Sequence, residues 1–73
     1  MIFPKLGEKV NVGIAGEELQ VGVITRIFKV AGIDAIEVAV CHRKEPGMLF
    51  IDFYRHGETW RMSDMIVEMI DNQ

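Results

Sequence analysis

Residues 36–55, IEVAVCHRKEPGMLFIDFYR, decide the fold prediction for this chain, because two apolar runs flank a turn sequence. In each run the apolar side chains recur at every second position, which places them on one face of an extended strand. These sets are Ile36, Val38 and Val40 in the first run and Leu49, Ile51 and Phe53 in the second. Lys44-Glu45-Pro46-Gly47 between the runs is typical of a tight turn. The stretch therefore predicts a β-hairpin with strands over about 35–43 and 48–55.

The flanking sequence continues this pattern of short apolar segments between Gly-containing and polar turns. It predicts further strands over about 8–14, 19–30 and 59–62. The strand over 19–30 would measure about 40 Å if it were straight, which is longer than a domain of this size is wide. It must bend, and Gly22 is a low-cost position for a kink or a bulge. The spacing of Ile24 and Ile27 also breaks strict alternation, as a bulged strand would. A long bent strand favours a small barrel over a flat sheet.

The end of the chain has features of a helix. Ser63 is a favourable N-cap, and Asp64 places a negative charge in the first turn. An apolar stripe at helical spacing follows: Met65, Ile66, Met69 and Ile70. The sequence thus predicts a short C-terminal helix over about 64–71, and the expected fold is a mostly β, five-stranded, strongly bent barrel with this helix added.

The composition limits the classes of protein to consider. The chain has 73 residues, 49% of them hydrophobic, which fits one folded domain over residues 1–73 and excludes a disordered chain. A core this small rarely encloses a deep active-site cleft, so we expect no enzyme. One cysteine allows no intramolecular disulfide, and no apolar run resembles a signal peptide or a membrane span. These features predict a cytoplasmic protein without a membrane partner.

The order of the expected strands resembles a Src-homology-3-like small barrel of the Tudor or KOW kind. The resemblance covers residues 6–62 and is carried by Leu6-Gly7-Glu8-Lys9-Val10, Gly22-Val23-Ile24-Thr25-Arg26-Ile27 and Thr59-Trp60-Arg61. It implies a non-catalytic binding module whose ligand lies across loops and an exposed aromatic patch.

Arg55-His56-Gly57-Glu58-Thr59 is similar to the phosphohistidine signature of the histidine phosphatase and phosphoglycerate mutase family. That resemblance implies His56 as the phosphorylated nucleophile and Arg55 as a phosphate clamp. The family, however, needs a second histidine and a large α/β domain after the signature, whereas only 14 residues follow Thr59. We therefore interpret the segment as a polar turn between two strands and predict no catalytic residue.

Aromatic and arginine side chains are enriched in protein-recognition hot spots, and the second half of this chain carries several. We predict that they form a surface for a protein partner, with Tyr54 and Trp60 as anchors and Arg55 and Arg61 as polar contacts. Phe28 and Arg43 extend the predicted surface. A second interpretation stays open for Trp60, because a barrel of this size needs a large side chain in its core.

Nucleic-acid binding is the alternative function. A local basic face would form if the third, fourth and fifth strands are neighbours, and Tyr54 and Trp60 would supply a stacking surface on it. Its basic residues would be Arg43, Lys44, Arg55 and Arg61, with His42 and His56. The net charge of −3 and the spread of charges along the chain favour a protein partner. The sequence has no close set of metal ligands, since adjacent Cys41 and His42 point to opposite faces of a strand, and we expect no cofactor.

Two apolar surfaces predict a homo-oligomer, unless they cover each other within one chain. One is the outer face of the strand over 48–55, and the other is the stripe of the expected helix. The outer-face residues are Met48, Phe50 and Tyr54. A compact acidic chain of this kind would also suit a phage or mobile-element accessory protein that blocks a host factor by steric occlusion.

Overall fold

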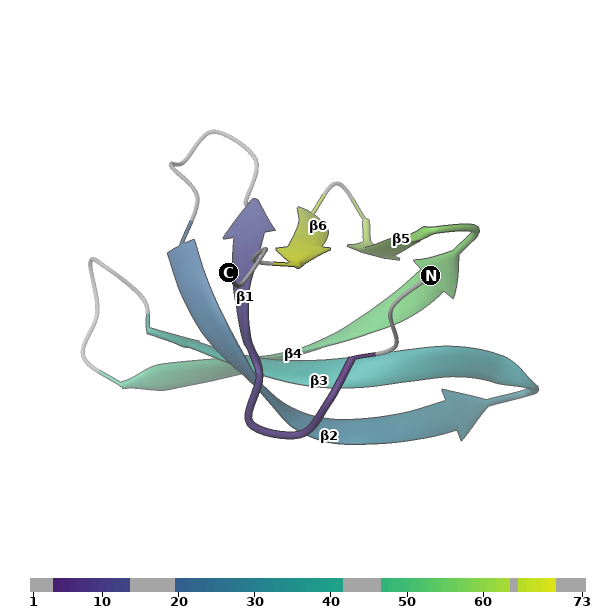
Figure 1. The fold of residues 1–73 in the computed structure, drawn as a ribbon, viewed down its shortest axis with the longest axis horizontal. Helices are drawn as coiled ribbons and strands as arrows, with labels where there is room; N and C mark the ends of the chain where they lie inside the picture. The colour runs from purple at the N-terminus through teal and green to yellow at the C-terminus, as the bar shows by residue number, and fades with distance from the viewer. Residues whose placement is uncertain (1–3, 14–19, 42–46, 64, 70–73) are drawn as a thin grey trace.

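The computed structural model describes residues 4–13, 20–41, 47–63 and 65–69, which form a small closed β-barrel (Figure 1). Each strand is antiparallel to the next one in the chain, and the last strand pairs with the first and closes the barrel. The strands are β1 (Lys9–Gly13), β2 (Gln20–Val30), β3 (Ile33–Cys41), β4 (Met48–His56), β5 (Thr59–Met62) and β6 (Met65–Met69). The mostly β fold is confirmed, with six strands among the described residues instead of five.

The expected C-terminal helix is wrong in its described part, where the chain forms β6. Ser63 does not cap a helix. Its φ of 57° lies in the left-handed region, where the chain reverses direction between Met62 and Met65. Val67 is buried and pairs with Val12 of β1 and Trp60 of β5. Pairing on both edges favours the extended conformation, which a helix of two turns could not match on propensity alone. Asp64 and Ile70 lie outside the described residues.

The long second strand bends as predicted, but Gly22 is not the bulge. The register between β2 and β3 shifts between Ile24 and Arg26, which places the irregularity at Thr25. Gly22 has a different role, because a Cβ atom there would lie 2.5 Å from Cγ1 of Val38. The glycine therefore lets β2 pass close over the core side chains of β3. Figure 1 shows β2 curving from the top of the barrel to its lower edge.

Tight turns join β2 to β3 and β4 to β5 and set the pairing register of these strands. Ala31 and Gly32 both have positive φ, 50° and 81°, and join Val30 to Ile33 as a type I′ turn does. Strand β3 therefore begins at Ile33, slightly before the predicted position 35. Gly57, with φ 62°, turns β4 into β5. The turn predicted over 44–47 lies outside the described residues except for Gly47, whose φ is 112°.

The barrel interior is filled by branched aliphatic side chains and two aromatic rings. Phe53 has no exposed surface and Trp60 is 4% exposed, so the interpretation of Trp60 as a core residue is confirmed. The predicted inner face of β4 is confirmed at Phe53, with Ile51 half-buried against the core, while Leu49 is 41% exposed although it pairs with the buried Val40. The buried cluster is Val10, Val12, Ile24, Ile36, Val38, Val40, Phe53, Trp60 and Val67.

Candidate interaction site

One row of side chains crosses the outer surface of four neighbouring strands. The register aligns Phe28 of β2 with Ala35 of β3, Ala35 with Tyr54 of β4, and Tyr54 with Arg61 of β5. Side chains directly opposite each other on adjacent strands lie on the same face of a sheet. The inner face at this level is occupied by the buried residues Ile36 and Phe53, next in sequence to Ala35 and Tyr54, so the row faces outward. We call Phe28, Ala35, Tyr54 and Arg61 the outer row.

The small residue at the centre of the outer row is fully covered. Ala35 has no exposed surface although it lies on the outer side of the barrel, while Phe28 and Tyr54 on either side are half-buried and Arg61 is exposed. Phe28 and Tyr54 are the cross-strand neighbours of Ala35 on this face, so their side chains are the ones placed to cover its methyl group. The outer row therefore presents two partly exposed aromatic rings over a small residue, with a cation at one end.

A cation–π contact fixes the other end of the row. The guanidinium carbon of Arg26 lies 4.2 Å from the centroid of the Phe28 ring. Nη2 of Arg26 is also 3.9 Å from Oε2 of Glu37, and the Thr25 hydroxyl donates to Oε1 of the same carboxylate at 2.9 Å. Glu37 thus holds Arg26 in place from β3. Arg26 is a part of this surface that the sequence analysis missed; its position two residues before Phe28 on a strand, on the same face, was the available signal.

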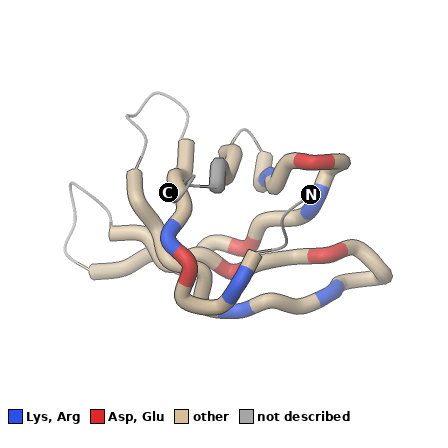
Figure 2. The backbone as a smooth tube through the Cα atoms, viewed as in Figure 1, with Lys and Arg blue, Asp and Glu red and all other residues tan. Residues whose placement is uncertain are grey.

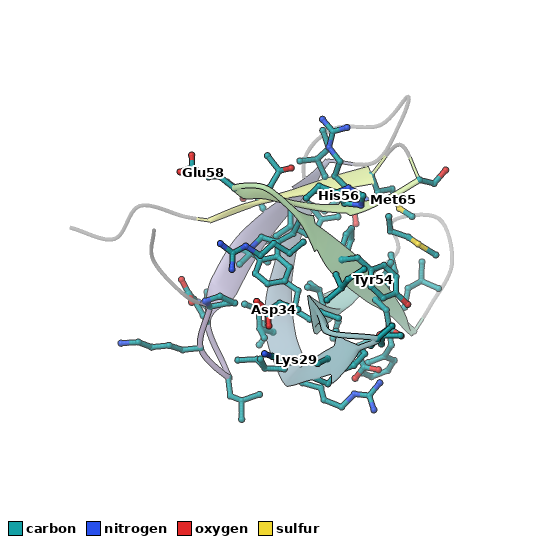
Figure 3. The ribbon with its side chains drawn as sticks, turned by 90° about the vertical axis from the view of Figure 1, so that its right-hand side faces the viewer. Lys29, Asp34, Tyr54, His56, Glu58 and Met65 are labelled. Atoms are coloured by element: carbon teal, nitrogen blue, oxygen red, sulfur yellow. The ribbon has the colours of Figure 1, made fainter. Side chains whose placement is uncertain are left out.

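The inner side of the same barrel end is closed by charges. Nη1 of Arg55 donates to Oδ2 of Asp34 at 3.2 Å, and its Nε donates to the carbonyl oxygen of Gly57 at 2.9 Å. Nζ of Lys29 lies 3.8 Å from Oδ1 of Asp34. Figure 3 views this end of the barrel, with Asp34 and Lys29 on one side of β4 and Tyr54 on the other. The Arg55–Asp34 ion pair therefore lies on the inner face of β3 and β4, on the opposite side from the outer row.

The structure separates the residues predicted as one surface. Tyr54, Arg61 and Phe28 come together in the outer row. Trp60 is buried in the core, and Arg55 is turned inward to Asp34, so neither offers a side chain to a partner beside Tyr54. The strand register explains this, because Arg55 pairs with Trp60 and both alternate with outward residues. Arg43 lies outside the described residues.

The phosphohistidine-like segment is a hairpin turn in which polar groups have structural partners. His56 pairs with Thr59 across the turn, and the Thr59 hydroxyl donates to the His56 carbonyl oxygen at 2.9 Å. Arg55, which the resemblance would assign to phosphate, bonds Asp34 and the Gly57 carbonyl. The interpretation of this segment as a polar turn is confirmed. That His56 is not a catalytic residue stays a prediction.

Charges of both signs are spread over the described backbone. Figure 2 shows the two basic residues of β2, Arg26 and Lys29, on the strand beside the two acidic residues of β3, Asp34 and Glu37. His42, Arg43 and Lys44 of the predicted basic face lie outside the described residues. Within the described part of the chain, no three His, Cys, Asp or Glu side chains gather as metal ligands would, and no helix is long and apolar enough to cross a membrane.

Comparisons of the chain with protein-family models, with curated proteins and with solved structures gave no match.

Proposed function

We propose that this barrel is a non-catalytic interaction module that binds a protein partner through the outer row. The observation that supports it is the pair of half-buried rings, Phe28 and Tyr54, raised over the buried Ala35 and flanked by the cations Arg26 and Arg61. Rigid aromatic rings beside arginine lose little conformational entropy on binding and bury a large area. The mechanism is steric docking on a preformed surface, without a covalent step.

The acidic neighbours of the outer row favour a protein over a nucleic acid. Glu37 and Asp52 lie opposite each other on the outer face of β3 and β4, one row away from Ala35 and Tyr54. A phosphate backbone that stacked bases on Tyr54 would pass these carboxylates, whereas a partner with a basic side chain would gain from them. Arg26 is already held by Glu37, which leaves Arg61 as the more open cation of the row.

The closed small β-barrel is compatible with the Src-homology-3-like resemblance. Barrels of the Tudor and KOW kind bind ligands on an exposed aromatic patch, and in this proposal the outer row takes that role. The blocking of a host factor by a phage or mobile-element accessory protein is one biological setting in which such a module acts alone.

Affinity capture followed by a titration tests the proposal. The immobilised chain captures partners from a cell extract, and each captured protein is then purified and titrated against the native chain and three variants. We expect Phe28→Ala and Tyr54→Ala each to weaken binding by about tenfold or more, as hot-spot residues do. The matched control is Val30→Ala, which changes a 45% exposed apolar residue at the β2–β3 turn, outside the outer row.

Binding measured at two salt concentrations, and capture repeated after nuclease treatment, distinguish a protein partner from a nucleic acid. Binding anchored by aromatic rings should change little between about 50 and 200 mM salt, whereas phosphate binding weakens steeply over that range. Equal affinity of Tyr54→Ala and the native chain for every captured protein would contradict the proposal. Loss of the captured material on nuclease treatment would favour nucleic acid instead.

A further inference from the structure

Half of β4 has a free edge among the described residues. β5 pairs with β4 only over 54–56, and β3 occupies the other edge along 48–54. The segment 48–53 therefore has no strand on its β5 side within the described part of the chain. Figure 1 shows this half of β4 extending to the left of the barrel, away from β5 and β6.

The register shows which backbone groups point toward this edge. His56 and Thr59 flank the β4–β5 turn and form a hydrogen-bonded pair, as the residues that flank such tight turns do. The direction of the N–H and C=O groups alternates along an antiparallel strand, so Met48, Phe50 and Asp52 direct theirs to the free edge. The backbone N–H and C=O groups of the intervening residues, Leu49 and Ile51, point toward β3. With respect to the described strands, the free edge is thus a short row of donors and acceptors without a backbone partner.

Residues 48–51 of this edge lack the charges that protect edge strands from pairing, and Asp52 is the one charged residue of the segment 48–53. Met48, Leu49 and Phe50 are 51%, 41% and 61% exposed, and none carries a charge. Proteins usually place lysine, proline or an inward charge on such an edge. The free second half of β2 follows that practice with the exposed residues Arg26 and Lys29. The β4 edge is therefore the one suited to accept another strand.

We propose that two copies of this chain associate by antiparallel pairing of their β4 edges about a two-fold axis at Phe50. This register places Phe50 opposite Phe50, Leu49 opposite Ile51 and Met48 opposite Asp52 of the second copy. Residues 48, 50 and 52, whose backbone groups point to the free edge, then pair with residues 52, 50 and 48 of the second copy. Each of these groups therefore gains a hydrogen-bonding partner. No like charges face each other, because the single carboxylate of the segment meets a methionine. The self-complementarity of the edge is the reason for choosing a second copy as the partner.

Side-chain packing supports the same arrangement. Val23, Ala39 and Phe50 are aligned across the outer face of β2, β3 and β4, and Ala39 is only 4% exposed between its neighbours. Pairing at Phe50 would extend this apolar row into the second copy. The Glu37 and Asp52 row lies between it and the outer row, so the dimer would leave Tyr54 and Phe28 available. The interface is smaller than the about 1,200 Å² of standard complexes, so we expect weak association.

Sedimentation equilibrium between about 10 µM and 1 mM tests the pairing. We expect the mean mass to rise from 8.3 kDa toward 16.6 kDa, twice the chain mass. Phe50→Pro removes an N–H that β3 does not use, so it should keep the fold and hold the mass at the monomer value. The matched control, Lys29→Pro, alters the corresponding free edge of β2 and should dimerise like the native chain. Near-ultraviolet circular dichroism of Trp60 checks that each variant is folded.

A cross-linking experiment tests the register without depending on proline. In a Cys41→Ser background, Phe50→Cys would place two thiols opposite each other at the two-fold axis, within the Cα separation that a disulfide spans. Mild oxidation should give a covalent dimer at 100 µM, while Val30→Cys in the same background should stay monomeric. A native mass of 8.3 kDa at all concentrations, or equal cross-linking of the two cysteine variants, would overturn the proposal.

Discussion

Replacing Gly22 with alanine is expected to destabilise the barrel by overpacking its core. An ideal Cβ at this position lies 2.5 Å from Val38 Cγ1, 3.1 Å from the Ala39 carbonyl oxygen and 3.2 Å from Val40 Cγ2. Carbon atoms in ordinary contact are about 3.5 to 4.0 Å apart, so the closest pair overlaps by about 1 Å. Val38 is fully buried, and its branched side chain has few other rotamers. The β2 backbone must therefore move away from β3.

The energetic cost follows from two opposing effects. Overpacking costs about 1 to 3 kcal/mol, and a 2.5 Å approach to the fully buried Val38 places Gly22→Ala at the upper end, near about 3 kcal/mol. The lower flexibility of alanine in the unfolded chain recovers about 0.5 to 1 kcal/mol. We expect Gly22→Ala to lower the free energy of unfolding by about 2 kcal/mol, a large part of the about 3 to 5 kcal/mol that a core this small supplies. Urea unfolding followed by Trp60 fluorescence measures it, with a matching decrease in Tm of about 8 to 16 °C.

A second substitution separates the clash from other effects of alanine. Val38→Ala removes the methyl group that the new Cβ meets, at a cost of about 2 kcal/mol when made alone. The double variant should be more stable than the sum of the two losses predicts, by at least about 1 kcal/mol. Additive losses, or a Gly22→Ala variant as stable as the native chain, would refute the close-approach argument.

Three further predictions concern the two faces of β4 and its turn. Phe53→Ala should lower the unfolding free energy by about 3 to 5 kcal/mol and Tyr54→Ala by less, because Phe53 is fully buried and Tyr54 is half-buried; thermal melts that give the reverse order would show the faces exchanged. Asp34→Asn should cost about 0.5 to 1 kcal/mol in urea unfolding, since the carboxylate meets Arg55 at a partly exposed site, and high salt should reduce the difference. His56→Ala should not change the rate at which the protein hydrolyses p-nitrophenyl phosphate; a loss confined to this variant would show that the turn is catalytic.

The alternation of apolar residues was enough to predict β1 to β5 and the inner face of β3, together with Ile51 and Phe53 on the inner side of β4. Ile36, Val38 and Val40 follow period 2, and all three are buried as expected. Alternation is a local property of an extended chain, so it can be read without knowing the neighbours. The bend of β2 was also predictable from its length. The break in alternation between Ile24 and Ile27 also indicated the bulge, and the register with β3 places it at Thr25, whereas Gly22, the other predicted position, pairs regularly with Val40.

The candidate site could be predicted only in part. The residue types of the outer row were identified from the enrichment of aromatic rings and arginine in binding surfaces, which led to Phe28, Tyr54 and Arg61. The exclusion of Trp60 and Arg55 required the pairing of β4 with β5, and the inclusion of Arg26 required its contact with the Phe28 ring. Which of several aromatic side chains is buried depends on strands distant in sequence.

The amino-acid sequence alone determined that this chain folds as one small, mostly β unit, because period-2 burial and turn residues act over a few neighbouring positions. Tertiary structure decided the fate of the last strand. Met65, Ile66 and Val67 fit a short helix or a strand on local preference, and the open edges of β1 and β5 select the strand by pairing with it on both sides. The same non-local pairing placed Arg61 on the outer face and Arg55 on the inner face, because the inside and outside of a barrel are defined only when its strands have paired.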